Sequence, residues 1–178
     1  MTNRRMILAL GVSVTLTAAG VTAQQVAKQE VAGITNFARV ETTIACGGAT
    51  KPEALSTLKK MGFNSVFNLR MPNEAGADIT ASESAAAAAG LNYVHIPWNA
   101  QSMDPSVGDR FMAEIVKPAN QPAYIHCAGG SRAAGMWLIK RLLVDKWDVD
   151  RAVKEATDLG LASERVKQYA LEYVRTHR

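Results

Sequence analysis

The sequence predicts a single α/β domain with a mostly parallel central sheet that is flanked by helices. The chain has 178 residues, of which 48% are hydrophobic. This length supports one hydrophobic core and is short for two ordinary domains. Short segments rich in β-branched and aromatic residues alternate with longer helical patterns, as in parallel sheets joined by helices. No internal repeat or linker interrupts the alternation, so we expect one continuous domain.

Four short apolar segments are predicted to be strands, because each contains β-branched or aromatic residues and ends at glycine, proline or polar turn residues. They are residues 37–45, 63–69, 93–96 and 123–126. The carboxyl ends of parallel strands meet at one edge of a sheet, where ligands bind. We therefore expect three strand-end segments to lie together, namely Asn68–Arg70, Trp98–Asn99 and Cys127.

Six helices are predicted from apolar periodicity and from their start and stop signals. Thr80 and Glu83 have the spacing of a capping box, and Gly90 is placed to end the same helix. Asp104 and Pro105 are typical of an N-cap followed by the first helical residue. The helices are expected at residues 52–61, 80–90, 105–116, 133–144, 149–159 and 163–176.

The N-terminus has the pattern of a removable signal peptide. Arg4 and Arg5 precede an apolar run, and small residues follow at the expected cleavage site. The run is too short to span a bilayer comfortably, so we predict an exported protein, periplasmic or secreted, without stable membrane insertion after cleavage. The next residues are polar and mixed. The predicted organisation is a signal peptide (1–23), a flexible lead-in (24–36) and an α/β domain (37–178).

The overall charge gives no support for nucleic-acid binding. The formal net charge is +4, and removal of the signal peptide would take away two arginines and no acidic residue. The remaining surplus is too small for an electrostatic footprint on a phosphate backbone. With only two cysteines, Cys46 and Cys127, the chain is not a disulfide scaffold. We expect free thiols, since a permanent bridge would remove Cys127 from the chemistry described next.

The chemistry is predicted to reside in residues 126–132, which we call the Cys127 loop. A strand, two glycines and a helix start would gather backbone N–H groups around a small anion, and the helix dipole would favour negative charge. Cysteines in such positions can have pKa values lowered to about 3.5–7.5, which would make Cys127 a nucleophile. The guanidinium of Arg132 suits a tetrahedral oxyanion. The candidate anion-binding residues of the loop are His126, Ala128, Gly129, Gly130 and Ser131.

Two residues outside the loop are candidates with competing interpretations. Asp104 follows a strand and could protonate a leaving oxygen as general acid, although its position beside Pro105 favours a helix cap. Glu74 and Asp78 are weaker candidates for the acid. Arg70 could be a second anion contact, or it could form a surface salt bridge with Glu74. No metal or organic cofactor is implied.

His126-Cys127 with Gly130 and Arg132 resembles the signature loop of cysteine-dependent protein phosphatases, in which five residues separate cysteine and arginine. Here the spacing is four, and Ala133 stands where those enzymes commonly carry a hydroxyl residue. Rhodanese-type sulfurtransferases have a similar loop that is one residue shorter. The shortened spacing therefore leaves the reaction type open between these two families.

Over about residues 34–161 the chain resembles the bacterial beta-lactamase-hydrolase-like group, whose fold is similar to that of dual-specificity phosphatases. The shared positions are Gly47-Gly48, Pro52-Glu53-Ala54-Leu55, Gly62-Phe63, Asn68-Leu69-Arg70, Glu74, Ile96-Pro97, His126-Cys127 and Arg132. The resemblance implies a cysteine-phosphatase-like fold and hydrolysis of a phosphate ester through a cysteinyl-phosphate, with a small anion or phosphorylated substrate as partner. Two alternatives remain: sulfur transfer through a Cys127 persulfide, and a non-catalytic module that senses an anion or the redox state.

Overall fold

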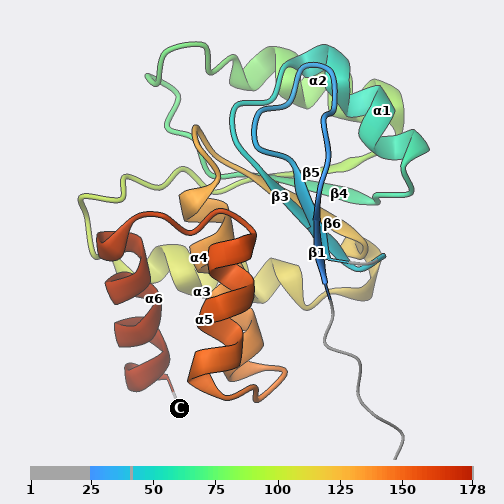
Figure 1. Cartoon of the computed structure of the whole chain (residues 1–178). Helices are drawn as coiled ribbons and strands as arrows, with labels where there is room; N and C mark the ends of the chain where they lie inside the picture. Colours follow the sequence, from blue (N-terminus) through green and yellow to red (C-terminus); the bar gives the residue numbers. More distant parts are fainter. Residues whose placement is uncertain (1–24, 41, 178) are drawn as a thin grey trace, which may run out of the picture.

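One six-stranded sheet forms the centre of the molecule (Figure 1), in the order β1-β2-β3-β6-β4-β5. The structure, a computed structural model, describes residues 25–40 and 42–177, so the predicted signal peptide lies outside the described residues. Strands β3, β6, β4 and β5 are parallel, whereas β1 and β2 run antiparallel at one edge. The predicted mostly parallel sheet is thus confirmed. The strands are β1 Val26–Lys28, β2 Ala38–Val40, β3 Ile44–Gly47, β4 Ser65–Asn68, β5 Asn92–His95 and β6 Ala123–His126.

The first predicted strand, residues 37–45, is in fact two strands. The chain reverses between Val40 and Ile44, and both the backbone N–H and the hydroxyl of Thr43 contact the Val40 carbonyl oxygen, at 3.3 and 3.2 Å. The two halves pair with each other as β2 and β3. The β-branched residues around this turn follow the strand pattern, which concealed the reversal.

The prediction that residues 24–36 form a flexible lead-in was also wrong, because this segment contains part of the sheet. β1 pairs with β2 with Val26 opposite Val40, and Ile34 is buried. β1 is an edge strand of only three residues, Val26–Lys28, and the side chains of Ala27 and Lys28 are exposed there. A short edge strand limits unwanted pairing of a sheet and lacks the apolar alternation used to recognise strands.

Helices cover both faces of the sheet. α1 and α2 lie on one face and α3–α6 on the other (Figure 1). Asp78, rather than Thr80, caps α2, because its carboxylate accepts from the Ala81 N–H at 2.9 Å, so the predicted capping box was wrong. Gly90 ends α2 in the left-handed region, as predicted. The helices are α1 Leu55–Lys60, α2 Ile79–Ala89, α3 Pro105–Ile115, α4 Ser131–Leu143, α5 Val149–Asp158 and α6 Glu164–Thr176, with 3-10 turns η1 Pro52–Ala54 and η2 Pro118–Asn120.

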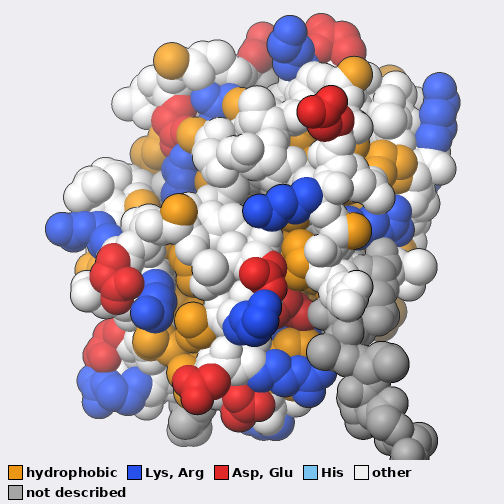
Figure 2. All heavy atoms as spheres, viewed as in Figure 1, with side chains coloured by type: hydrophobic (Ala, Val, Ile, Leu, Met, Phe, Trp, Pro, Cys, Tyr) orange, Lys and Arg blue, Asp and Glu red, His pale blue; other side chains and the backbone are white. Residues whose placement is uncertain are grey.

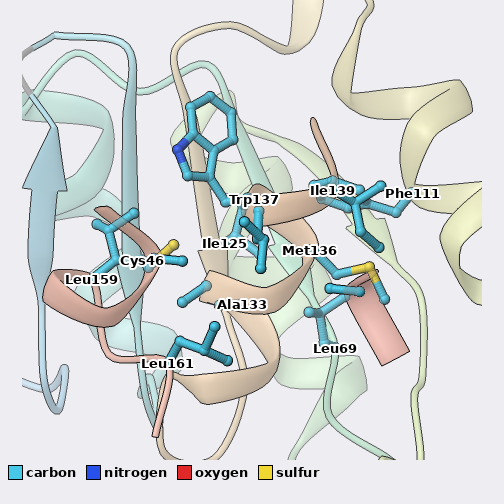
Figure 3. Close-up of a cluster of buried hydrophobic side chains, with 14 of the residues drawn as sticks. Cys46, Leu69, Phe111, Ile125, Ala133, Met136, Trp137, Ile139, Leu159 and Leu161 are labelled. Carbon is cyan, nitrogen blue, oxygen red and sulfur yellow. The ribbon is translucent and has the colours of Figure 1, made fainter. Parts of the chain in front are cut away.

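The larger of two apolar cores lies between the sheet and α4, the helix that follows the Cys127 loop. Cys46 and Ile125 from the sheet face Ala133, Met136 and Trp137 of α4 (Figure 3). Burial of this much apolar surface fixes the start of α4 relative to the strand ends. Among the described residues, no helix has both the length and the apolar character that a membrane span requires.

Candidate active site

The strand ends meet at one edge of the sheet, as the predicted topology requires. The parallel strands β3, β6, β4 and β5 end at Gly47, His126, Asn68 and His95. The Arg132 guanidinium at the start of α4 joins these ends, because its Nη1 donates to Leu69 O at 3.0 Å and to Trp98 O at 2.6 Å. The residues that follow β4, β5 and β6 therefore surround one site.

The Cys127 loop turns tightly between β6 and α4. The Cys127 N–H donates to Gly47 O at 3.2 Å, and the Gly130 N–H donates to the Cys127 sulfur at 3.1 Å. Gly130 has a φ of 104°, a left-handed conformation that glycine adopts at low cost, and it is the N-cap of α4. The sulfur thus faces a backbone donor and the N-terminal turn of a helix, an environment that stabilises negative charge.

The outer side of the loop is held by neighbouring segments. Ala128 O accepts from the Ala49 N–H at 2.8 Å, and Gly129 O accepts from Asn36 Nδ2 at 3.1 Å. Asn36 itself has a positive φ of 52°. These bonds tie the loop to the segments before β2 and after β3, while the Gly130 N–H contacts the sulfur. Anion binding by the Ala128 and Gly129 backbone stays a prediction.

The Ser131 hydroxyl has a structural partner rather than an open position. It accepts from the backbone N–H groups of Ala162 and Ser163 at 3.1 and 3.0 Å. These bonds tie the connection between α5 and α6 to the Cys127 loop. In both bonds the hydroxyl oxygen is the acceptor, so its O–H remains a donor, and anion binding by Ser131 stays a prediction.

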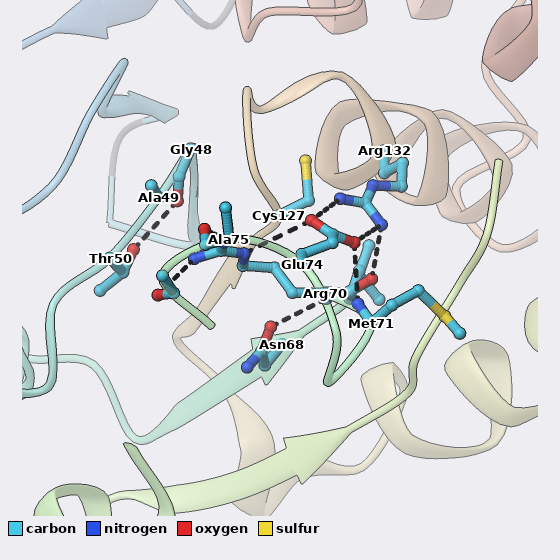
Figure 4. A network of polar contacts seen from close by, with 12 residues as sticks. Gly48, Ala49, Thr50, Asn68, Arg70, Met71, Glu74, Ala75, Cys127 and Arg132 are labelled. Atoms are coloured by element: carbon cyan, nitrogen blue, oxygen red, sulfur yellow. Dashed lines mark hydrogen bonds and ion pairs between the residues drawn. The ribbon is translucent and has the colours of Figure 1, made fainter. Parts of the chain in front are cut away.

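Arg132 is held by a bidentate pair with Glu74 (Figure 4). Nη1 and Nη2 of Arg132 donate to Oε1 and Oε2 of Glu74 at 2.7 and 2.8 Å, and the Met71 N–H donates to Oε1 at 2.8 Å. Partial burial alone would raise the pKa of Glu74, but these hydrogen bonds and the charges of Arg132 and Arg70 lower it. The carboxylate is therefore ionised and fixes the guanidinium in place.

One edge of the Arg132 guanidinium remains directed to the sulfur. Besides its bonds to Glu74 and to the two carbonyl oxygens, the guanidinium has a side-chain hydrogen bond with Cys127. Burial alone would lower the pKa of Arg132, but the hydrogen bond and charge of Glu74, together with the interaction with Cys127, raise it. The Nε–Nη2 edge is the fork that binds two oxygens of a phosphate or carboxylate.

Arg70 lies beside Glu74, the residue that holds Arg132, and its guanidinium is bonded within the turn after β4. Its side chain is 5% exposed, and its Nε lies 3.5 Å from Glu74 Oε2. Nη1 and Nη2 donate to the carbonyl oxygens of Gly76 and Ala75 at 3.0 and 2.5 Å. The structure thus shows the predicted pair with Glu74, in which the Arg70 side chain is buried and the Glu74 side chain is partly exposed. The prediction of a second anion contact is corrected, since the turn after β4 occupies this guanidinium.

His126 carries no positive charge in the site. Burial, with a contribution from the Arg70 charge, lowers the pKa of His126 to about 3. Its Nδ1 has no hydrogen-bond partner among the described residues, and its ring stacks on Tyr124 with centroids 5.7 Å apart. As a neutral ring, His126 packs behind the loop and adds no charge for anion binding.

Asp104 caps α3, as the favoured interpretation predicted. Its carboxylate accepts from the Ser106 N–H at 2.9 Å, and its carbonyl oxygen accepts from the Tyr169 hydroxyl at 3.0 Å. A role for Asp104 as general acid stays a prediction.

The bidentate pair between Glu74 and Arg132 was not predicted from the sequence. Glu74 was considered only as an alternative acid or as a partner of Arg70. The presence of Glu74 in the turn after β4 was the signal that could have indicated this role.

Gly48 is expected to be essential for the position of the loop. A Cβ at Gly48 would collide with Thr35 Oγ1 and come within 2.9 Å of Ala128 O. We expect Gly48→Ala to lower the free energy of unfolding by about 1–3 kcal/mol, the usual cost of overpacking, measured by urea denaturation. Gly129→Ala is the matched control, because its Cβ would meet nothing within 4 Å. Equal losses in both variants would contradict this explanation.

The fold and site define a class: an α/β domain of the cysteine-based phosphatase type, with a cysteine and an arginine on one loop. The chain belongs to the family of the beta-lactamase hydrolase-like protein, phosphatase-like domain, whose model matches residues 36–144. It is 27% identical over 107 residues to a beta-lactamase hydrolase-like protein from Agrobacterium fabrum. That match covers 59% of this chain and 25% of the relative, so the chain spans about a quarter of the relative's length.

Solved structures share the fold at low sequence identity. A DUF442 protein from Shewanella putrefaciens CN-32 has a TM-score of 0.68 and 19% identity, covering 81% of this chain and 92% of its own. TpbA from P. aeruginosa has a TM-score of 0.64 and 18% identity, and the match covers 88% of this chain and 91% of TpbA. The core catalytic domain of the PP-IP phosphatase SIW14 from S. cerevisiae has a TM-score of 0.65 and 18% identity, and the match covers 81% of this chain and 88% of that domain. These similarities confirm the predicted cysteine-phosphatase-like fold.

Proposed function

We propose that this chain is a cysteine-dependent phosphatase that hydrolyses phosphate esters through a cysteinyl-phosphate intermediate. The observation that carries the proposal is the Arg132 guanidinium. Glu74 and two carbonyl oxygens hold it beside Cys127, with which it is also hydrogen-bonded. A preorganised bidentate donor next to a nucleophile stabilises the equatorial oxygens of a phosphoryl group in the transition state.

In the first step, the Cys127 thiolate attacks phosphorus and the bond between phosphorus and the leaving oxygen breaks. The leaving oxygen takes a proton, for which Asp104 is the predicted donor. The Gly130 N–H, 3.1 Å from the sulfur, favours the thiolate before attack and after release. In the second step, water attacks the cysteinyl-phosphate, inorganic phosphate leaves, and the sulfur recovers its electron pair.

The similar proteins support a phosphorylated substrate. TpbA has been solved in complex with phosphotyrosine, and SIW14 is described as a PP-IP phosphatase. Sulfur transfer rests only on the four-residue spacing between Cys127 and Arg132, and none of these relatives is described as a sulfurtransferase. We therefore assign phosphate-ester hydrolysis to the site.

The test compares two reactions catalysed by the same purified protein. We expect turnover of p-nitrophenyl phosphate that vanadate inhibits, and an acid-quenched reaction that contains protein phosphorylated at Cys127. Transfer of sulfur from thiosulfate to cyanide is measured in parallel. Sulfur transfer without phosphate release would overturn the proposal in favour of the persulfide mechanism, and the absence of both reactions would indicate a non-catalytic module.

A further inference from the structure

A groove of about 1040 Å³ lies beside the Cys127 loop and has no part in the mechanism above. Residues 28–32 and 34–38 line one side, and the connection between α5 and α6 lines the other. Gly129 of the Cys127 loop lines it as well. The groove therefore begins at the catalytic loop and extends away along the N-terminal part of the sheet.

Both walls of the groove are hydrogen-bonded to the Cys127 loop. From one wall, Asn36 Nδ2 donates to Gly129 O at 3.1 Å. From the other, the Ala162 N–H donates to Ser131 Oγ at 3.1 Å. These bonds fix the groove relative to the nucleophile, so a ligand with its phosphorylated group at Cys127 can place neighbouring groups in a preformed surface.

The charge of the groove disfavours a polyanionic ligand. Its ionisable lining consists of Lys28, Glu30 and Asp158, and Asp158 is already paired with Lys154 at 2.8 Å. Glu30 is therefore the carboxylate of the lining that has no ion pair among the described residues. On the face shown in Figure 2, acidic and basic side chains are interspersed without a large basic patch. An inositol polyphosphate or a nucleic acid requires clustered positive charge. Glu30 instead complements a ligand that carries a positive charge near its phosphorylated group.

The backbone at the edge of the groove suits a polypeptide. The Gln29 N–H donates to Phe37 O at 3.0 Å, and Lys28 lies opposite Ala38 in the register of β1 and β2. Because hydrogen-bonded and non-hydrogen-bonded pairs alternate in an antiparallel ladder, the Lys28 backbone groups point outward. β1 has no second neighbour in the described sheet. An extended peptide can bind such an edge through main-chain hydrogen bonds.

We propose that the groove binds the extended polypeptide segment next to a phosphorylated side chain, with a basic residue of that segment facing Glu30. The inference deepens the proposed function, because it assumes that the phosphorylated group occupies the Cys127 loop. It assigns a phosphorylated protein, rather than a free polyphosphate, as the substrate class. Apolar side chains such as Val31 and Leu159 complete the lining.

Binding measurements on the Cys127→Ser protein test this proposal. The probe is a short fluorescein-labelled phosphotyrosyl peptide with arginines on both sides of the phosphotyrosine, and free phosphotyrosine and inositol hexakisphosphate are competitors. We expect the peptide to bind at least about tenfold more tightly than phosphotyrosine. Ala32→Trp places a large side chain in the groove at an exposed position and should remove this difference. Ala88→Trp, at an exposed position of α2, is the matched control and should keep it.

Glu30→Lys provides a second variant whose result does not depend on filling the groove. This substitution should weaken binding of the arginine-flanked peptide and strengthen binding of a glutamate-flanked peptide. Three outcomes would each overturn the proposal. The first is equal affinity for the peptide and for phosphotyrosine, and the second is an equal effect of Ala32→Trp and Ala88→Trp on peptide binding. The third is tight binding of inositol hexakisphosphate that Ala32→Trp abolishes. Turnover of p-nitrophenyl phosphate by the unmutated protein is measured separately. Its absence with retained peptide binding would refute the phosphatase mechanism and leave the groove assignment standing.

Discussion

Replacement of Cys127 by serine is expected to reduce turnover of p-nitrophenyl phosphate by at least about 10³-fold. Serine preserves the size of the side chain, but its hydroxyl stays protonated near neutral pH even beside the Gly130 N–H and the start of α4. The loss should appear in kcat, while binding of vanadate or phosphotyrosine persists, because the substitution leaves Arg132 and the loop amides, the proposed anion donors, in place. Steady-state kinetics together with ligand titration measure the two effects.

Cys46→Ala is the matched control for this experiment. Cys46 is fully buried in the large core, and burial, with a contribution from Cys127, raises the pKa of its thiol well above the ordinary value. Removing its sulfur should lower the free energy of unfolding by about 1–2 kcal/mol and leave kcat unchanged. A Cys127→Ser protein with normal turnover, or equal losses in the two variants, would remove Cys127 as the nucleophile.

Glu74→Gln is expected to lower kcat/KM by about 10-fold to 100-fold, because a small displacement of a transition-state donor has effects of this size. Glutamine can accept at only one oxygen, so the bidentate pair with Arg132 is lost and the repulsion between Arg132 and Arg70 is no longer offset. Glu74 acts here as a positioning residue through Arg132. Its effect should therefore largely vanish when Arg132 is already replaced by lysine. Additive losses in the double variant would contradict this role.

The stability effect of Glu74→Gln should depend on pH in a defined direction. The folded-state pKa of Glu74 lies below its ordinary value, so its ionised form stabilises the folded state. This contribution is fully present above the unfolded pKa of about 4.3 and is lost as the pH falls through the folded pKa. We expect Glu74→Gln to cost about 1–2 kcal/mol at pH 7, decreasing toward pH 3. Urea denaturation at both pH values tests this, and an equal cost at both would assign the effect to packing.

Much of the fold followed from local patterns in the sequence. The strand at 123–126 was predicted with its observed bounds, and Asp104 and Gly90 were correctly placed at helix ends. These features depend on hydrogen bonds and backbone preferences within a few residues, which a sequence displays directly. The Cys127 loop belongs to the same group, because its glycine at position 130 and the helix start after it are local features.

The errors share a physical cause, which is dependence on distant partners. β1 has only three residues and exists only because β2 provides hydrogen-bond partners at the edge, and the turn near Thr43 lies in a β-branched segment. Glu74 and Arg132 are 58 residues apart, so their pairing is invisible to any local pattern. The groove likewise combines the N-terminal segment with the connection between α5 and α6.

The sequence by itself determined the α/β class, the Cys127 loop and the family resemblance, because alternating periodicity and a compact motif are encoded over short stretches. The signal peptide stays a prediction from the sequence. Only the tertiary structure decided which polar and charged groups meet across the chain: Glu74 with Arg132, and the walls of the groove with Gly129 and Ser131. It also decided that the pair of Glu74 with Arg70 is buried on the Arg70 side. Side-chain contacts of this kind arise when packed strands and helices bring their ends to one edge of the sheet, and their geometry is a property of the assembled core.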